Sequence, residues 1–110
     1  MTPARIEHDL LGDKEVPAER YFGVQTQRAL ENFAITLIPI SHYSQFINAL
    51  AYVKKAAALS NQKLGLLEDE IAAVIVVASD KILAGEYHGE FVVDCIQGGA
   101  GTSTNMNANE

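Results

Sequence analysis

The feature that most constrains this fold is a pair of apolar stripes with helical spacing between residues 41 and 85. In each stripe the apolar residues recur at i, i+4, i+7 and i+11, which is one face of a helix. Gly65 and Gly85 follow the stripes, and glycine is the commonest residue just past a helix end. Ser41 is the candidate N-cap of the first helix. The stripes consist of Phe46, Leu50, Val53 and Ala57, and of Ile71, Ile75, Ala78 and Ile82.

The second of these segments also contains a β-branched run, 74–77, that by itself would suit a strand. The length between the flanking glycines and the acidic residues 68–70 favour a helix, because carboxylates near a helix start interact well with its dipole. Apolar residues lie on its opposite side as well, so we expect this helix to be buried on more than one face. These further residues are Ala72, Val76 and Leu83.

The remaining segments are shorter. Gly12-Asp13 separates two segments that could form a small hairpin, closed by Pro17. A short helix is expected from about Val24 to Glu31, an extended segment around Pro39, and an apolar run over 91–96. A third helix begins near Thr102 or Ser103 and is cut off at the end of the sequence. The fold class predicted is mainly α, with a possible N-terminal hairpin.

Composition excludes several functions. The 110 residues are 48% hydrophobic and 20% charged, as in a soluble globular domain, and carry a formal charge of −6. A negative charge argues against nucleic-acid or anionic-membrane partners. Cys95 is the sole cysteine, so a reducing compartment is the simplest interpretation. Without an apolar signal region at the N-terminus or a run long enough to span a bilayer, we expect a cytoplasmic protein.

The last stretch, QGGAGTSTNMNANE (97–110), concentrates hydrogen-bond donors. A glycine-rich turn into a helix start exposes backbone N–H groups at the positive end of the helix dipole, and the hydroxyls of Thr102, Ser103 and Thr104 and the amides of Asn105 and Asn107 add neutral donors. Such a turn can hold a carboxylate or phosphate without a cation. An ordinary turn followed by an N-cap is the alternative from the residues alone. A nucleotide site is a weaker one, because the third glycine of G-x-G-x-x-G and a P-loop lysine are absent.

Other reactive side chains give no site. His8, His42 and His88 show no metal-ligand spacing, and Cys95 has no His or Asp partner within sequence reach. We therefore expect no metal site.

Three segments, in this order, resemble the aspartase/fumarase superfamily: RIEHDLLGDKEVPAERYFGVQTQRALENF, VKKAAALSNQKLGLL and GGAGTSTNMNANE. Gly-Ala-Gly-Thr-Ser at 99–103 is similar to aspartases, whereas fumarases typically read Gly-Ser-Gly-Thr-Gln. The resemblance implies a mainly helical subunit with a small N-terminal domain and a central helix bundle. It also implies a homotetramer whose active sites are each built from three subunits.

The activity that the resemblance implies is reversible elimination of ammonia from L-aspartate to give fumarate, without an organic cofactor. By the same resemblance, Thr102 binds the substrate, with Ser103 beside it. Gly99, Ala100, Gly101, Thr104 and Asn105 then form the supporting loop.

Members of this superfamily are several times longer, and their catalytic serine base lies beyond residue 110. We therefore expect residues 1–110 to be an incomplete N-terminal lyase domain that supplies one wall of a shared site and is inactive alone. The alternatives are the same piece of a fumarase, or a short non-catalytic chain that binds the full-length enzyme.

Overall fold

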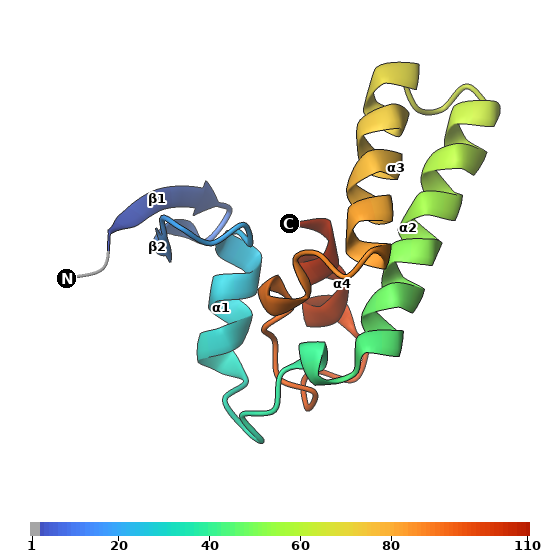
Figure 1. Ribbon diagram of the computed structural model, residues 1–110. Helices are drawn as coiled ribbons and strands as arrows, with labels where there is room; N and C mark the ends of the chain where they lie inside the picture. Colours follow the sequence, from blue (N-terminus) through green and yellow to red (C-terminus); the bar gives the residue numbers. More distant parts are fainter. Residues whose placement is uncertain (1–2) are drawn as a thin grey trace. The chain divides into compact units, whose positions relative to one another are not determined.

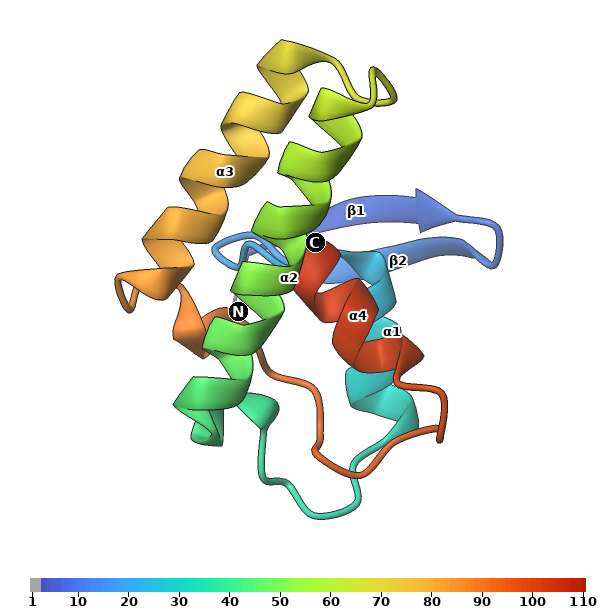
Figure 2. The same cartoon turned by 90° about the vertical axis from the view of Figure 1, so that its right-hand side faces the viewer.

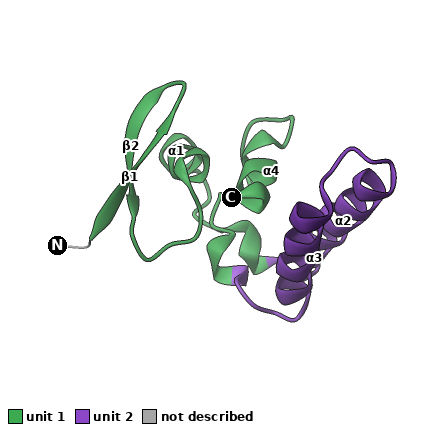
Figure 3. Ribbon diagram, turned by 90° about the horizontal axis from the view of Figure 1, so that it is seen from above, with its two compact units in different colours: residues 1–42, 89–110 green, residues 43–88 purple. Residues whose placement is uncertain are grey.

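The computed structural model describes residues 3–110, which form two compact units (Figure 3). Unit 1 comprises the described residues up to His42 together with Gly89–Glu110, and unit 2 comprises Tyr43–His88. The fold is mainly helical with one small hairpin, as the sequence predicts. In chain order (Figure 1) the elements are β1 (Ala4–Asp9), β2 (Gly12–Pro17), α1 (Val24–Asn32), a 3₁₀ turn (Ile40–His42), α2 (Ser44–Lys63), α3 (Asp69–Leu83), a second 3₁₀ turn (His88–Glu90) and α4 (Thr102–Asn109).

The hairpin of unit 1 pairs β1 with β2 in antiparallel register, from Ala4 opposite Pro17 to Asp9 opposite Gly12. Its existence and its end at Pro17 are confirmed. The turn itself lies two positions earlier than Gly12-Asp13 suggests, at residues 10–11, and Gly12 opens β2 with φ 115°. The Asp9 carboxylate shapes this turn by accepting the Leu11 N–H at 2.9 Å.

Charged side chains join the hairpin to α1. Arg28 bonds to both carboxylate oxygens of Asp9, at 2.8 and 2.9 Å, and Gln25 donates to the same carboxylate at 2.6 Å. The hydrogen bond from Arg28 holds the pKa of Asp9 below its ordinary value and raises that of Arg28. Beneath these contacts lies an apolar cluster of Val16, Phe22 and Val24, against which Leu30 and Val92 pack.

Helices α1 and α4 also belong to unit 1 and lie side by side in both views (Figures 1 and 2). The segment 38–41 runs antiparallel to 91–95, with hydrogen bonds from Ile40 N–H to the Val93 carbonyl and from Cys95 N–H to the Ile38 carbonyl. The predicted apolar run therefore pairs with the extended segment around Pro39, through a single β-bridge between Pro39 and Asp94.

Unit 2 is a pair of antiparallel helices, α2 and α3 (Figure 2). Both end in the same motif. Gly65 and Gly85 have φ 75° and 99°, and the N–H groups of each glycine and of the following residue bond back to carbonyls of the last turn. Both predicted helix ends are confirmed, and so is the choice of helix over strand for 74–77.

Two details of unit 2 differ from the sequence prediction. Ser41 is not an N-cap, because it lies in a 3₁₀ turn and α2 begins at Ser44. The predicted stripe of α2 is not its buried face: Phe46 and Val53 are 43% and 63% exposed. Apart from Ile47, the helices instead bury small side chains that permit close approach. The buried residues are Ile47, Ala51 and Ala58 of α2 and Ala72 and Ser79 of α3.

Helix α3 is also less covered than predicted. Ile71, Val74 and Val77 are about half to two-thirds exposed, so burial on more than one face is wrong for this chain. Within residues 3–110, no helix is both long enough and apolar enough to cross a membrane.

Candidate functional site

The glycine-rich loop of unit 1 leads directly into α4. Gly101 occupies the N-cap position with φ 74° and ψ 15°, a left-handed conformation that favours glycine. Its N–H bonds to the Gly98 carbonyl at 3.2 Å, which closes the turn. Because Gly101 has no side chain, α4 has no side-chain N-cap of the usual kind.

The start of α4 therefore presents unused donors. Among the residues that the structure describes, the N–H groups and hydroxyls of Thr102 and Ser103 have no hydrogen-bond partner. The next N–H, that of Thr104, bonds to Oε1 of Gln97 at 2.9 Å. Two backbone donors and two hydroxyls thus remain at the positive end of the helix dipole.

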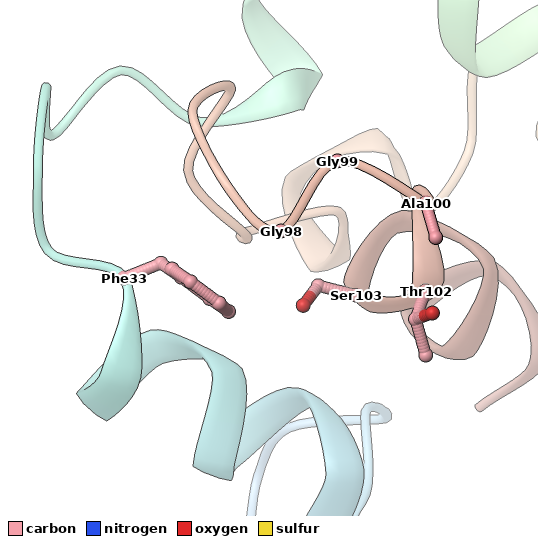
Figure 4. Close-up of a pocket in the computed structure, with 6 residues that line it drawn as sticks. All are labelled: Phe33, Gly98, Gly99, Ala100, Thr102 and Ser103. Atoms are coloured by element: carbon pink, nitrogen blue, oxygen red, sulfur yellow. The ribbon is translucent and has the colours of Figure 1, made fainter.

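These donors border an open pocket of about 320 Å³ (Figure 4). In Figure 4 the Ser103 hydroxyl points toward the ring of Phe33, while the Thr102 side chain points away from it. Phe33, just past the end of α1, forms the facing wall and comes close to Gly98. The lining residues are Phe33, Gly98, Gly99, Ala100, Thr102 and Ser103.

Most of the residues singled out in the sequence are therefore brought together. Thr102 and Ser103 share the pocket with Gly99 and Ala100, and Gly101 makes the turn between them. The supporting residues Thr104 and Asn105 lie outside the pocket lining, in the first turn of α4. Their N–H groups bond to Gln97 and to the Gly101 carbonyl respectively.

Asn107 is a correction. The sequence counts its amide among the donors of the loop, but the side chain is buried and turned toward 90–93. Its Oδ1 accepts the N–H groups of Val92 and Val93 at 2.9 and 3.3 Å, and its Nδ2 donates to the Glu90 carbonyl at 2.9 Å. This amide thus fastens α4 to residues 90–93 and does not line the pocket.

Asp94 is a structural residue of the site that sequence reasoning missed. Its buried carboxylate accepts the N–H groups of residues 35, 36, 37 and 96 and the Thr36 hydroxyl. Burial by itself raises the pKa of Asp94, but the hydrogen bonds from the Thr36 hydroxyl and from backbone N–H groups outweigh it and hold the pKa well below its ordinary 3.8. The sequence offers one indication of this role: Asp94 is the single acidic residue inside the apolar run 91–96.

Two glutamates cap α1 from a distance. Glu7 Oε1 accepts the Val24 N–H at 2.9 Å. Glu110 accepts the Gln25 N–H through Oε2, at 3.0 Å, and both the N–H and hydroxyl of Thr26 through Oε1, at 2.7 and 2.6 Å. Strand β1, through Glu7, and the last residue of the sequence, Glu110, are therefore bonded to the same helix start. The bonds from Glu110, which follows α4 directly, hold α1 against α4.

Histidine and cysteine do not gather at the pocket. His8 pairs with Asp13 at 2.8 Å on the surface, and Nε2 of His88 bonds to the Ile82 carbonyl at 2.9 Å. Cys95 is half-buried, with its sulfur 3.4 Å from the Thr36 hydroxyl. In the part of the chain that the structure describes, no group of three or more His, Cys, Asp or Glu side chains could hold a metal ion.

The chemistry open to this pocket follows from its walls. Neutral donors at a helix start can hold an anion such as a carboxylate, and the wall opposite is an aromatic ring. Residues 98–103 contain no Asp, Glu, His or Lys side chain. The pocket can therefore bind and orient an anionic ligand through neutral donors.

Comparison with known proteins gives consistent matches. The sequence model of the lyase family matches residues 12–110. An aspartate ammonia-lyase of Pseudomonas aeruginosa is 55% identical over 107 residues, which cover 97% of this chain and 23% of that protein. A class II fumarate hydratase of Halobacterium salinarum is 54% identical over 106 residues, which cover 96% of this chain and 22% of that protein.

The fold matches equally well. The crystal structure of a fumarate lyase:delta crystallin from Brucella melitensis superposes with a TM-score of 0.94 at 50% sequence identity. The match covers 97% of this chain and 25% of that one. The chain thus spans about a quarter of the length of the relatives that it matches.

Proposed function

This chain belongs to the lyase family, in the aspartase/fumarase superfamily, and we propose that it forms the N-terminal domain of an aspartate ammonia-lyase. The observation that carries the proposal is the loop 99–103. It reads Gly-Ala-Gly-Thr-Ser, as aspartases do, and it borders an open pocket with the unused donors of Thr102 and Ser103.

The proposed reaction needs donors of this kind. A base removes a proton from the carbon next to the β-carboxylate of L-aspartate, and negative charge accumulates on that carboxylate before ammonia leaves. Donors held in place by the fold stabilise this charge more in the transition state than in the ground state. The start of α4 offers such donors without a cation, and its dipole has the favourable sign.

Thr102 and Ser103 have distinct parts in this proposal. By resemblance to the superfamily, Thr102 contacts the β-carboxylate and the amino group of the substrate. The Ser103 hydroxyl points across the pocket toward Phe33, so it is placed to meet a second polar group of a bound dicarboxylate (Figure 4). Gly99, Ala100 and Gly101 let the backbone approach the ligand, while Thr104 and Asn105 begin the helix behind it.

The test is the conversion of L-aspartate to fumarate by the whole protein, followed by fumarate absorbance. In Thr102→Val the hydroxyl is replaced by a methyl group of similar size, and we expect kcat/KM to fall by roughly 10²–10³-fold. Thr102→Ser keeps the hydroxyl and should retain most of the activity. Ser60→Ala removes an exposed hydroxyl of α2 and is the matched control. Equal activity in Thr102→Val and the control would remove Thr102 from the site.

Fumarate hydration is the second candidate, because the class II fumarate hydratase is nearly as similar as the ammonia-lyase. The two activities are separated by offering L-aspartate and L-malate to the same preparation. Fumarate from aspartate supports the ammonia-lyase, whereas fumarate only from malate makes the protein a fumarase. Ala100→Ser with Ser103→Gln would install the fumarase-like loop and should impair aspartate turnover if these positions select the substrate.

We also propose that this domain acts only within the whole protein, as one wall of a site shared between subunits of a homotetramer. Supporting this, the pocket that the described residues form is lined by no Asp, Glu, His or Lys side chain, and unit 2 exposes large apolar side chains. Among them are Tyr52, Val53, Val74 and Val77, all more than half exposed. Residues 1–110 alone should form no fumarate from aspartate. Light scattering of the whole protein should give a tetramer, and Val74→Glu should weaken it.

A further inference from the structure

The side chain of Gln97 spans the loop that borders the pocket. Its Nε2 donates to the Asp94 carbonyl at 2.9 Å, and its Oε1 accepts the Thr104 N–H at 2.9 Å. One amide therefore joins the segment before the glycines to the first turn of α4. Between Gln97 itself and Thr104 lie the six residues 98–103, which include all the pocket residues except Phe33.

Few other contacts hold this loop. Within residues 98–101, the hydrogen bond from Gly101 N–H to the Gly98 carbonyl closes the turn. Residues 98–100 are exposed, and three of the four residues 98–101 are glycine, which has no side chain to restrict its backbone angles. The conformation of the loop thus depends on what happens at its two ends, and Gln97 bonds to both.

Both anchors of Gln97 are themselves fixed. Asp94 is fastened by the five hydrogen bonds that its carboxylate accepts from residues 35–37 and 96, and α4 is fastened by Asn107 to residues 90–93. The Gln97 side chain can hold the loop because both groups to which it bonds, the Asp94 carbonyl and the Thr104 N–H, belong to segments that are themselves held in place.

Gln97 also decides which helix donors stay available. In the absence of an N-cap side chain, an acceptor is needed for the first N–H groups of α4. Gln97 takes the third of them, that of Thr104, from outside the helix. The N–H groups of Thr102 and Ser103 have no partner among the described residues, and Gln97 does not line the pocket that they border.

We propose that Gln97 is a positioning residue for the reaction: through its bridge from Asp94 to Thr104 it holds Thr102 and Ser103 in the geometry that binds the dicarboxylate. It touches no substrate and acts only through the loop. This inference rests on the proposed function, and it adds a residue that neither the sequence pattern nor the pocket lining identifies.

The test compares Gln97→Met with Gln62→Met in the whole protein. Methionine keeps the length of the side chain and removes both hydrogen bonds. Gln62 also donates one side-chain hydrogen bond, to Asp69 at 3.0 Å, but it is in α2 and outside the loop. We expect kcat/KM for L-aspartate to fall roughly 10- to 100-fold in Gln97→Met, since small misplacement of binding groups has effects of this size. The thermal midpoint should stay close to that of Gln62→Met.

A second readout does not depend on activity. Amide hydrogen exchange of the peptide covering 98–104 should be faster in Gln97→Met than in the wild type, whereas the peptide covering α2 should be unchanged. Kinetic constants and exchange equal to those of the Gln62→Met control would overturn the proposal. So would a loss of activity that only matches a loss of folded protein.

Gln97→Glu serves if Gln97→Met does not fold. It keeps the acceptor for the Thr104 N–H but turns a carboxylate oxygen toward the Asp94 carbonyl, so kcat/KM should fall and exchange at 98–104 should rise. Unchanged values in Gln97→Glu overturn the proposal. If the wild type forms fumarate only from malate, or from neither substrate, the proposed function fails. The exchange measurement then still decides whether Gln97 holds the loop.

Discussion

Unit 1 and unit 2 are each stabilised internally by a different kind of contact. Unit 2 is a helix pair whose ends are closed by the backbone itself, at Gly65 and Gly85, and whose buried face consists mostly of small side chains. Unit 1 has irregular segments held by polar side chains that bond to residues distant in the sequence, above all the buried Asp94 and Asn107 and the exposed Glu110.

The difference matters for function because the pocket belongs to unit 1. A glycine-rich loop cannot hold its own shape, so its conformation has to be imposed by side chains from distant positions. Unit 2 needs no such side chains, because helices satisfy their backbone groups locally. Substitutions of polar residues should therefore be costly in unit 1 and mild in unit 2.

The largest effect is expected from Asp94→Asn. The new NH₂ group would face backbone N–H donors of residues 35–37, and these part-buried donors would lose their acceptor, while the amide itself would stay buried. We expect a loss of roughly 3 kcal/mol in the free energy of unfolding of the whole protein. The matched change in unit 2 is Asp80→Asn, which removes an exposed ion pair with Lys55 and should have almost no effect. Similar losses in both variants would contradict the distinction between the units.

The same carboxylate predicts a pH dependence. Because the pKa of Asp94 is lower in the folded than in the unfolded protein, its ionised form contributes stability above the ordinary 3.8. That contribution is lost as the pH falls below 3.8 toward the depressed folded value. Urea unfolding between pH 5 and 3 should therefore show stability falling less steeply in Asp94→Asn than in the wild type. Parallel curves would show that the carboxylate is not bound as described.

A smaller loss is expected from Asn107→Ala. The N–H groups of Val92 and Val93 and the Glu90 carbonyl would lose their partner, and Val93 is fully buried. We expect a loss of about 2 kcal/mol in the free energy of unfolding. Asn61→Ala, at an exposed position of α2, should cost less than about 0.5 kcal/mol.

Gly23→Ala tests the caps of α1. A Cβ at this position would lie 2.5 Å from Oε2 of Glu110 and 2.8 Å from Oε1 of Glu7, so both carboxylates would have to move away from the helix start. Losing these caps should cost about 1–2 kcal/mol. Gly89→Ala is the control in the same unit, since a Cβ there meets nothing within 4 Å. If the two variants unfold at the same urea concentration, the glutamates contribute no stability as caps.

The smallest of these losses is expected in unit 2, from Gly65→Ala. A Cβ would meet nothing within 4 Å, but φ is 75°, which is strained for alanine. The expected cost is about 1 kcal/mol, measured by urea unfolding. Gly65→Asn should cost less, because asparagine tolerates the left-handed conformation. A larger loss than in Gly23→Ala would reverse the ranking of the two units.

Sequence reasoning located the helices well because their signals are local. Gly65 and Gly85 follow apolar segments with helical spacing and end the two helices of unit 2. The helix predicted to begin near Thr102 or Ser103 begins at Thr102, directly after the glycine-rich turn. The existence of the hairpin and of the short helix from Val24 also followed from neighbouring residues.

The buried faces were predicted less well. Phe46 and Val53 have helical spacing with their neighbours, but spacing does not say which face meets another helix. The buried faces of α2 and α3 carry small residues such as Ala51 and Ser79, because two helix backbones can approach closely only where side chains are small. Thr102 and Ser103, the substrate-binding residues predicted from the sequence, line the pocket, and so does Phe33, which the sequence analysis did not single out.

By itself, then, the sequence determined the helical class of this protein, its family and the loop that carries the proposed substrate contacts. Only the tertiary structure decided that Asn107 is turned away from the pocket, that Asp94 is the anchor of the surrounding segments and that Gln97 joins both ends of the loop. The physical reason is range. Helix caps and periodicity depend on residues a few positions apart, whereas a buried polar side chain depends on partners that folding alone brings within hydrogen-bond distance.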